Sequence, residues 1–200
     1  MDHCVEALCS LEATQKSDTK AETGLRLLVP GLLRCKADPM DIEARRQCQM
    51  AVNLAMDNVR AGIPMGGSHA IGHQLGPLGV PHGVTSCIMC PAVMQYNIKH
   101  GQDNPEIARR QSLVQTILWS IPEVASQFQT AGFDTSVDLG NLIDSIIRAL
   151  GLPRTLSEMS IGEDMIDKLA ARALHDQWSP TNPVPLVKAE QVREILMACR

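Results

Sequence analysis

The chain has 200 residues, of which 44% are hydrophobic and 20% are charged, and its formal net charge is −4. This length suits one globular domain with a hydrophobic core. Acidic residues outnumber basic ones and aromatic residues make up only 2% of the chain, which argues against a nucleic-acid-binding protein. No apolar run approaches the roughly 18 to 20 residues of a membrane span and no signal peptide is recognisable, so we expect a cytoplasmic protein without membrane or nucleic-acid partners.

Apolar residues recur at helical spacing along the whole chain, and no stretch favours a strand. The polar stretch 17–20 should separate the first helix from the second, and Pro30 should kink or end the second. Ser160 and Glu163 have the spacing of a capping box, which predicts a helix start near Gly162. In chain order, the expected helices cover residues 2–15, from 21 onward, 41–60, 67–75, 84–99, 105–121, 122–129, 138–150, 162–174 and 189–199. We therefore predict an all-α helical bundle that forms a single domain over residues 1–200.

Three of the six histidines lie within fourteen residues, at positions 69, 73 and 82. His69 and His73 are four residues apart, so on a helix their imidazoles point into the same volume. The Gly- and Pro-rich stretch 76–81 should end that helix and form a loop that brings His82 to the other two. Neutral imidazole is a common ligand of divalent transition metals. A metal site is therefore favoured over a solvated pair of histidines near a helix end.

The residues around these histidines resemble the iron-containing alcohol dehydrogenase family, which includes glycerol dehydrogenase and maleylacetate reductase. The matching strings are His69-Ala70-x-x-His73-x-Leu75-Gly76, Pro81-His82-Gly83 and Cys90-Pro91-x-Val93-Met94-x-Tyr96-Asn97. A second match, His3-Cys4-Val5-Glu6-Ala7, resembles the helix that carries another ligand in that family. This string and the segment 181–185 favour the maleylacetate reductase branch. The resemblance covers essentially the whole chain and is most specific in the histidine block.

The resemblance implies a divalent metal, iron or zinc, held by His3, His69 and His82, with His73 near the substrate as the catalytic proton relay. A fourth ligand would lie four residues before His3, a position that this sequence does not contain. Asp2 lies about 100° round a helix from His3, so it should not replace that ligand without distortion. Glu6 either orients an imidazole or is simply solvated.

Family members also carry an N-terminal α/β domain that binds a nicotinamide cofactor, and this sequence resembles only the helical C-terminal domain. Gly66-Gly67-Ser68 is the nearest string to a phosphate-binding loop, but it leads directly into the histidine helix and does not follow a strand. We therefore expect no cofactor-binding residues here, and NAD(P) binding only if another chain supplies the missing domain.

Three functions fit these features. The first is an oxidoreductase domain in which the metal polarises a carbonyl of a small-molecule substrate for hydride transfer from NAD(P)H. An alternative is a truncated, repurposed lyase, isomerase or cyclase that uses the histidine pocket without a cofactor. The third is a catalytically inactive interaction protein that dimerises, because loss of the upstream domain should expose an apolar interface.

The remaining histidines and the cysteines carry weaker signals. Seven cysteines, an odd number without a secretory signal, indicate reduced thiols. Cys87 and Cys90 form a single Cys-x-x-Cys pair, which is better explained by buried thiols than by redox or zinc chemistry. His100 and His175 lie near expected helix ends, where the helix dipole alone explains them, so neither is predicted as a ligand.

Overall fold

The computed structural model describes residues 1–200, and it contains helices and no strands, which confirms the predicted all-α class. None of these helices is long and apolar enough to cross a membrane. The α-helices are α1 (Asp2–Cys9), α2 (Gln15–Ala37), α3 (Ile42–Arg60), α4 (Gly67–Leu75), α5 (His82–His100), α6 (Pro105–Trp119), α7 (Pro122–Thr130), α8 (Leu139–Leu150), α9 (Ile166–Ala173) and α10 (Ala189–Ala198). Three short 3-10 helices are η1 (Gly76–Leu78), η2 (Ser157–Met159) and η3 (Glu163–Met165).

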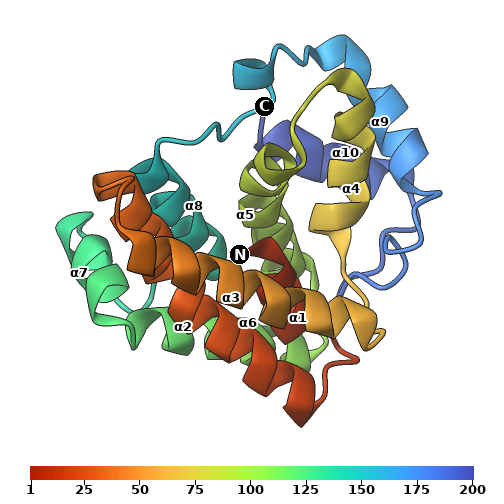
Figure 1. The fold of residues 1–200 in the computed structure, drawn as a ribbon. Coiled ribbons are helices and arrows are strands. Elements are labelled where there is room, and N and C mark those ends of the chain that lie inside the picture. The colour runs from red at the N-terminus through yellow and green to blue at the C-terminus, as the bar shows by residue number, and fades with distance from the viewer.

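Helix α5 runs through the middle of the molecule (Figure 1). The long helices α2 and α3 pack against each other on one side, together with α7 and α8, whereas α4, α9 and α10 gather on the other side (Figure 1). One continuous core of buried apolar residues joins both sides, and it includes residues of α1, α5, α8 and α10. Helix α1 lies inside this arrangement and contacts α2, α3, α5 and α6, so its side chains are fixed by packing from several directions.

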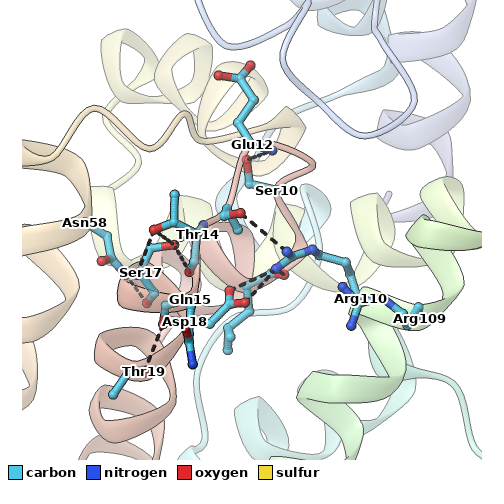
Figure 2. A network of polar contacts seen from close by, with 12 residues as sticks. Ser10, Glu12, Thr14, Gln15, Ser17, Asp18, Thr19, Asn58, Arg109 and Arg110 are labelled. Carbon is cyan, nitrogen blue, oxygen red and sulfur yellow. Dashed lines mark hydrogen bonds and ion pairs between the residues drawn. The ribbon is translucent and has the colours of Figure 1, made fainter.

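The boundary between the first two helices differs from the sequence expectation. Helix α1 ends at Cys9, because Ser10 adopts an extended backbone, and α2 begins at Gln15. The side chain of Thr14 accepts a hydrogen bond from the Ser17 backbone N–H, and the Ser17 hydroxyl accepts one from the Thr14 N–H (Figure 2). The polar stretch 17–20 was therefore wrongly predicted as a break, because its first residue completes a helix cap.

The expectations for Pro30 and Ser160 had different outcomes. Pro30 lies inside α2 and does not end it, so the alternative that it kinks the helix stays a prediction. The carbonyl left without a donor belongs to Arg26, an exposed residue. Ser160 does not cap a helix start, because it adopts a left-handed conformation with φ of 58° and ends η2. The helix start expected near Gly162 is nevertheless close, because η3 begins at Glu163 and leads directly into α9 at Ile166.

A close approach between α8 and α5 depends on Gly140. A Cβ atom added there would lie 2.6 Å from the backbone carbonyl oxygen of Pro91 and 2.6 Å from Cγ of Gln95. We expect Gly140→Ala to lower the free energy of unfolding by about 1 to 3 kcal/mol, because the backbone of α5 must move to accommodate the methyl group. Urea denaturation measures this change. Gly76→Ala is the matched control, since its Cβ would meet no atom within 4 Å, and equal losses in both variants would contradict the prediction.

Candidate metal centre

Helix α1 carries the first part of the site. It is only eight residues long, yet all of its residues except His3 are buried, and His3 is half-buried. His3 and Glu6 are three residues apart and therefore share one face of this helix. That face meets the start of α4, where Glu6 contacts residues 66–69. The short first helix thus places an imidazole and a carboxylate beside the histidine helix.

The three predicted metal ligands converge from three helices. His3 comes from α1, His69 from α4 and His82 from α5, and one ligand atom of each lies within 4.8 Å of the others. The ring centroids are 4.3 Å apart for His3 and His69, 6.0 Å for His69 and His82, and 6.3 Å for His3 and His82. His82 is the first residue of α5, so the expectation that it lies in a loop was wrong. The preceding residue, Pro81, is the N-cap of α5, and its ring prevents the helix from starting earlier in the chain.

Glu6 fixes the orientation of His69. Its carboxylate lies 2.6 Å from Nδ1 of His69 and accepts hydrogen bonds from the backbone N–H groups of Gly66, at 3.0 Å, and Ser68, at 2.8 Å. With Nδ1 donating to Glu6, the lone pair of the neutral ring lies on Nε2. That Nε2 atom is buried and has no hydrogen-bond partner. Of the two roles considered for Glu6, the structure supports the orienting one.

Asp2 lies on the Nδ1 side of the same imidazole. Its Oδ2 atom accepts a hydrogen bond from the Ser68 hydroxyl at 2.8 Å and is 3.5 Å from Nδ1 of His69. Asp2, Glu6 and His69 form a second group of potential ligands, which shares His69 with the group of three histidines. Asp2 belongs to this second group and not to the group of three histidines.

Burial and charge act differently on the two inner histidines. Burial, helped by the neighbouring His69, lowers the pKa of His3 to about 4, which leaves that ring neutral near pH 7. Burial also disfavours a charged His69, but Asp2 and Glu6 outweigh it and raise the pKa of His69 to about 9. The pKa of Glu6 is raised by its burial and by the nearby Asp2. The raised pKa keeps a proton on His69 near pH 7, so a metal cation that binds Nε2 would displace that proton and take over the compensation of the two carboxylates.

These features fit a divalent transition metal. Three imidazole nitrogens converge, and one of them, Nε2 of His69, is buried without a hydrogen-bond partner. The other nitrogen of that ring, Nδ1, contacts the carboxylate of Glu6. Such carboxylate-supported imidazoles are typical of zinc and non-haem iron sites.

His73 lies beside this group and outside it. Its ring centroid is 6.3 Å from those of His69 and His82, and its Nδ1 atom is 2.8 Å from Oδ2 of Asp176. The indole of Trp178 packs against both rings, with centroids 5.3 Å from His73 and 5.6 Å from His69. The side chain of His73 is 37% exposed, so it can be reached from solvent.

Sequence reasoning missed Asp176 and Trp178. They lie in the connection between α9 and α10, about one hundred residues after His73, and no local pattern links them to it. The same connection supports the start of α4, because Oδ1 of Asn182 accepts hydrogen bonds from the Gly67 N–H, at 3.0 Å, and from the Asn97 amide, at 3.2 Å.

The other candidate residues lie outside the site or carry unreactive groups. His100 contacts Glu194 and packs on Tyr96, and His175 is exposed on the surface. Cys90 is buried and Cys87 is partly buried, and burial raises the pKa of the Cys87 thiol to about 11. These thiols stay protonated near neutral pH, which agrees with the prediction that the Cys-x-x-Cys pair is not a reactive dithiol.

The fold and the converging imidazoles define the chain as a helical domain built around a candidate metal centre. The family model described as "Fe-containing alcohol dehydrogenase family, C-terminal" matches residues 1–199, and the chain belongs to this family. The resemblance noted in the sequence is thereby confirmed.

Curated relatives include Dehydrogenase ALT3 of Alternaria alternata, which is 38% identical over 98% of this chain and 54% of that protein. Dehydrogenase FUM7 of Gibberella moniliformis is 35% identical over 88% of this chain and 41% of that protein. The chain thus spans about half the length of the curated relatives it matches.

Solved structures support the same fold. A 1,3-propanediol oxidoreductase superposes with a TM-score of 0.77 at 25% identity, covering 100% of this chain and 49% of that one. Maleylacetate reductase from Agrobacterium tumefaciens superposes with a TM-score of 0.75 at 21% identity, covering 99% and 49% of the two chains. At that identity the second likeness shows the fold alone.

Proposed function

We propose that this chain is the metal-binding half of an NAD(P)-dependent oxidoreductase that interconverts an alcohol and a carbonyl compound. The observation that carries the proposal is the convergence of His3, His69 and His82, with the free Nε2 of His69 buried among them. The family supports an oxidoreductase role at the level of the domain. The relatives are about twice as long as the matched region, so we propose that the nicotinamide is bound by a segment outside these residues or by another chain.

In this proposal each residue of the site has a distinct task. His3, His69 and His82 hold a divalent ion, iron or zinc, which would supply Lewis-acid polarisation of a substrate oxygen. Glu6 holds His69 in the tautomer whose Nε2 is free. Asp176 holds His73 through Nδ1, which leaves Nε2 of His73 to give or take the proton of the substrate hydroxyl. Trp178 packs against both rings and restricts their rotation.

Removing His82 tests the metal site with little effect on the fold, because this residue is exposed at the start of α5. We expect the wild-type chain to bind one zinc or iron ion. We expect His82→Ala to weaken binding by more than the roughly 10- to 100-fold loss that follows removal of an outer-shell partner. Elemental analysis and competition with a chromophoric chelator measure stoichiometry and affinity.

The control is His100→Ala, which removes an exposed histidine from the other end of the same helix. It should bind metal as the wild type does. If His82→Ala keeps one ion at wild-type affinity, the assignment of His82 as a ligand is wrong. If the wild-type chain binds no ion, the metal site as a whole is wrong.

A further inference from the structure

Helices α2 and α3 carry one cysteine each, and these two cysteines lie side by side. Cys35 is in the last turn of α2, Cys48 is in the first half of α3, and the two helices pack against each other. Both thiols are free and partly exposed, whereas four of the other five cysteines are buried. The pair is therefore within reach of small reagents from solvent.

The backbones of the two helices approach each other closely beside this pair. A Cβ atom added to Gly31 would lie 2.8 Å from Sγ of Cys48, 3.3 Å from the carbonyl oxygen of Ala44 and 3.7 Å from the backbone nitrogen of Cys48. Gly31 and Cys35 are four residues apart and therefore share one face of α2. The Cys48 thiol thus lies over the face that carries Cys35, and the two thiols are within hydrogen-bonding distance of each other.

We propose that Cys35 and Cys48 form an oxidation-sensitive dithiol that a hydroperoxide converts into a disulfide between α2 and α3. One thiol attacks the peroxide, so its sulfur is oxidised to a sulfenic acid while the O–O bond breaks and an alcohol leaves, or water in the case of hydrogen peroxide. The second thiol attacks that sulfur, the S–S bond forms, and the sulfenic hydroxyl takes up the proton of the second thiol and leaves as water. Two thiols and one hydroperoxide thus give one disulfide, one alcohol and one water.

The surroundings assign the two steps to different thiols. Burial and the neighbouring Cys35 thiol raise the pKa of Cys48, so Cys48 is protonated near neutral pH. We therefore assign Cys35 as the thiol that attacks the peroxide and Cys48 as the thiol that resolves the sulfenic acid. Cys87 is the third partly exposed cysteine, but it lies on α5, and burial raises its pKa to about 11. It should stay reduced.

A packing role alone explains the pair less well. A cysteine that serves only as a small apolar residue is typically buried, and these two are partly exposed. Thiols that respond to peroxides combine access from solvent with a second thiol nearby that can resolve the sulfenic acid. Cys35 and Cys48 meet both conditions.

Oxidation of the folded chain with a small excess of hydrogen peroxide, followed by alkylation and tryptic digestion, tests the proposal. Cleavage after Arg34, Lys36 and Arg46 places the two cysteines in separate peptides, so mass spectrometry identifies a link between them directly. The free thiols titrated in denaturant should fall by two from the original seven, and dithiothreitol should restore them. Absence of the linked peptides, or a disulfide formed by other cysteines, would overturn the proposal.

Single variants test the order of the two steps. In Cys48→Ser the reaction should stop at the sulfenic acid of Cys35, which dimedone traps, whereas Cys35→Ser should yield little dimedone adduct. Cys87→Ser is the control, since it removes the other partly exposed thiol and should form the disulfide as the wild type does. If Cys48→Ser gives no adduct on Cys35, Cys35 is not the attacking thiol. If Cys87→Ser forms no link between Cys35 and Cys48, the two do not act as an independent pair.

Stability shows whether the bond fits the native packing of α2 and α3. The disulfide closes a loop in the unfolded chain, so oxidation should raise the midpoint of urea denaturation by about 1 M. Met40 and Met50 are exposed and can also be oxidised, and the double variant Cys35→Ser/Cys48→Ser controls for this effect because it should show no rise. A midpoint that oxidation lowers in the wild type but not in the double variant would show that the bond strains the helix pair, and it would overturn the proposal.

Discussion

Replacement of Glu6 by alanine is expected to weaken both the fold and the metal site. Glu6 is buried, and its carboxylate accepts hydrogen bonds from two backbone N–H groups and from His69. Its loss leaves those N–H groups buried without an acceptor and removes a compensating charge from His69. We expect a loss of about 3 to 5 kcal/mol in the free energy of unfolding. Zinc affinity should fall roughly 10- to 100-fold, because the orienting partner of His69 is gone.

Glu6→Gln separates orientation from folding. The amide oxygen of glutamine can still accept from Nδ1 of His69, but the amide nitrogen cannot accept from a backbone N–H. This variant should be more stable than Glu6→Ala and should recover part of the zinc affinity. Glu12→Gln, at an exposed position just after α1, is the matched control and should match the wild type. Wild-type zinc affinity in a folded Glu6→Ala protein would contradict the orienting role.

Replacement of Arg110 by methionine should produce the second large effect. Arg110 is buried on α6, and its Nη1 atom donates to Asp18 at 2.9 Å (Figure 2). The same atom donates to the carbonyl oxygen of Leu8 at 3.1 Å. Its Nε atom donates to Glu106 at 3.0 Å. This side chain therefore ties the end of α1 to α2 and α6. Methionine keeps the apolar stem but leaves the Leu8 carbonyl and Asp18 without a donor, so we expect a loss of about 2 to 3 kcal/mol in urea denaturation.

The neighbouring Arg109 provides the control. Its side chain is 61% exposed and pairs with Glu106 on the same helix (i, i+3). Arg109→Met should lower the stability far less than Arg110→Met does, as expected for an exposed ion pair. If the two arginine variants lose the same stability, the links from Arg110 to Leu8 and Asp18 do not hold α1 in place.

The sequence predicted the parts of the site that follow a local period or a motif. The spacing of His69 and His73 placed both imidazoles on one face of α4, the Gly- and Pro-rich stretch 76–81 predicted that His82 joins them, and the resemblance to the family added His3. Asp176 and Trp178 could not be predicted in this way, because their contacts with His73 depend on how a long connection folds back over α4. A period along the chain describes one helix face, whereas such contacts depend on the packing of distant segments.

The helix boundaries also fall into two groups, those that a local sequence signal predicts and those that it does not. The long amphipathic helix α8 was predicted almost to the residue, since its apolar stripe and the glycine after it are local signals. The start of α2 was missed because the residues that looked like a polar break form a cap. For Pro30 the sequence left two outcomes open, a kink or a helix end, and the structure excludes the helix end.

The position of α1 at the centre of the molecule has a consequence for how the protein folds. Glu6 bonds to Gly66 across 60 residues, and Arg110 bonds to Leu8 across 102. The pocket of imidazoles therefore cannot form from a local hairpin of helices, and it must wait until remote parts of the chain have docked. An ion that binds only the finished pocket would stabilise the whole domain against unfolding, by about 2.7 kcal/mol when its free concentration is a hundred times the dissociation constant. Zinc added during refolding would then act on the last step of assembly and leave the first collapse unchanged.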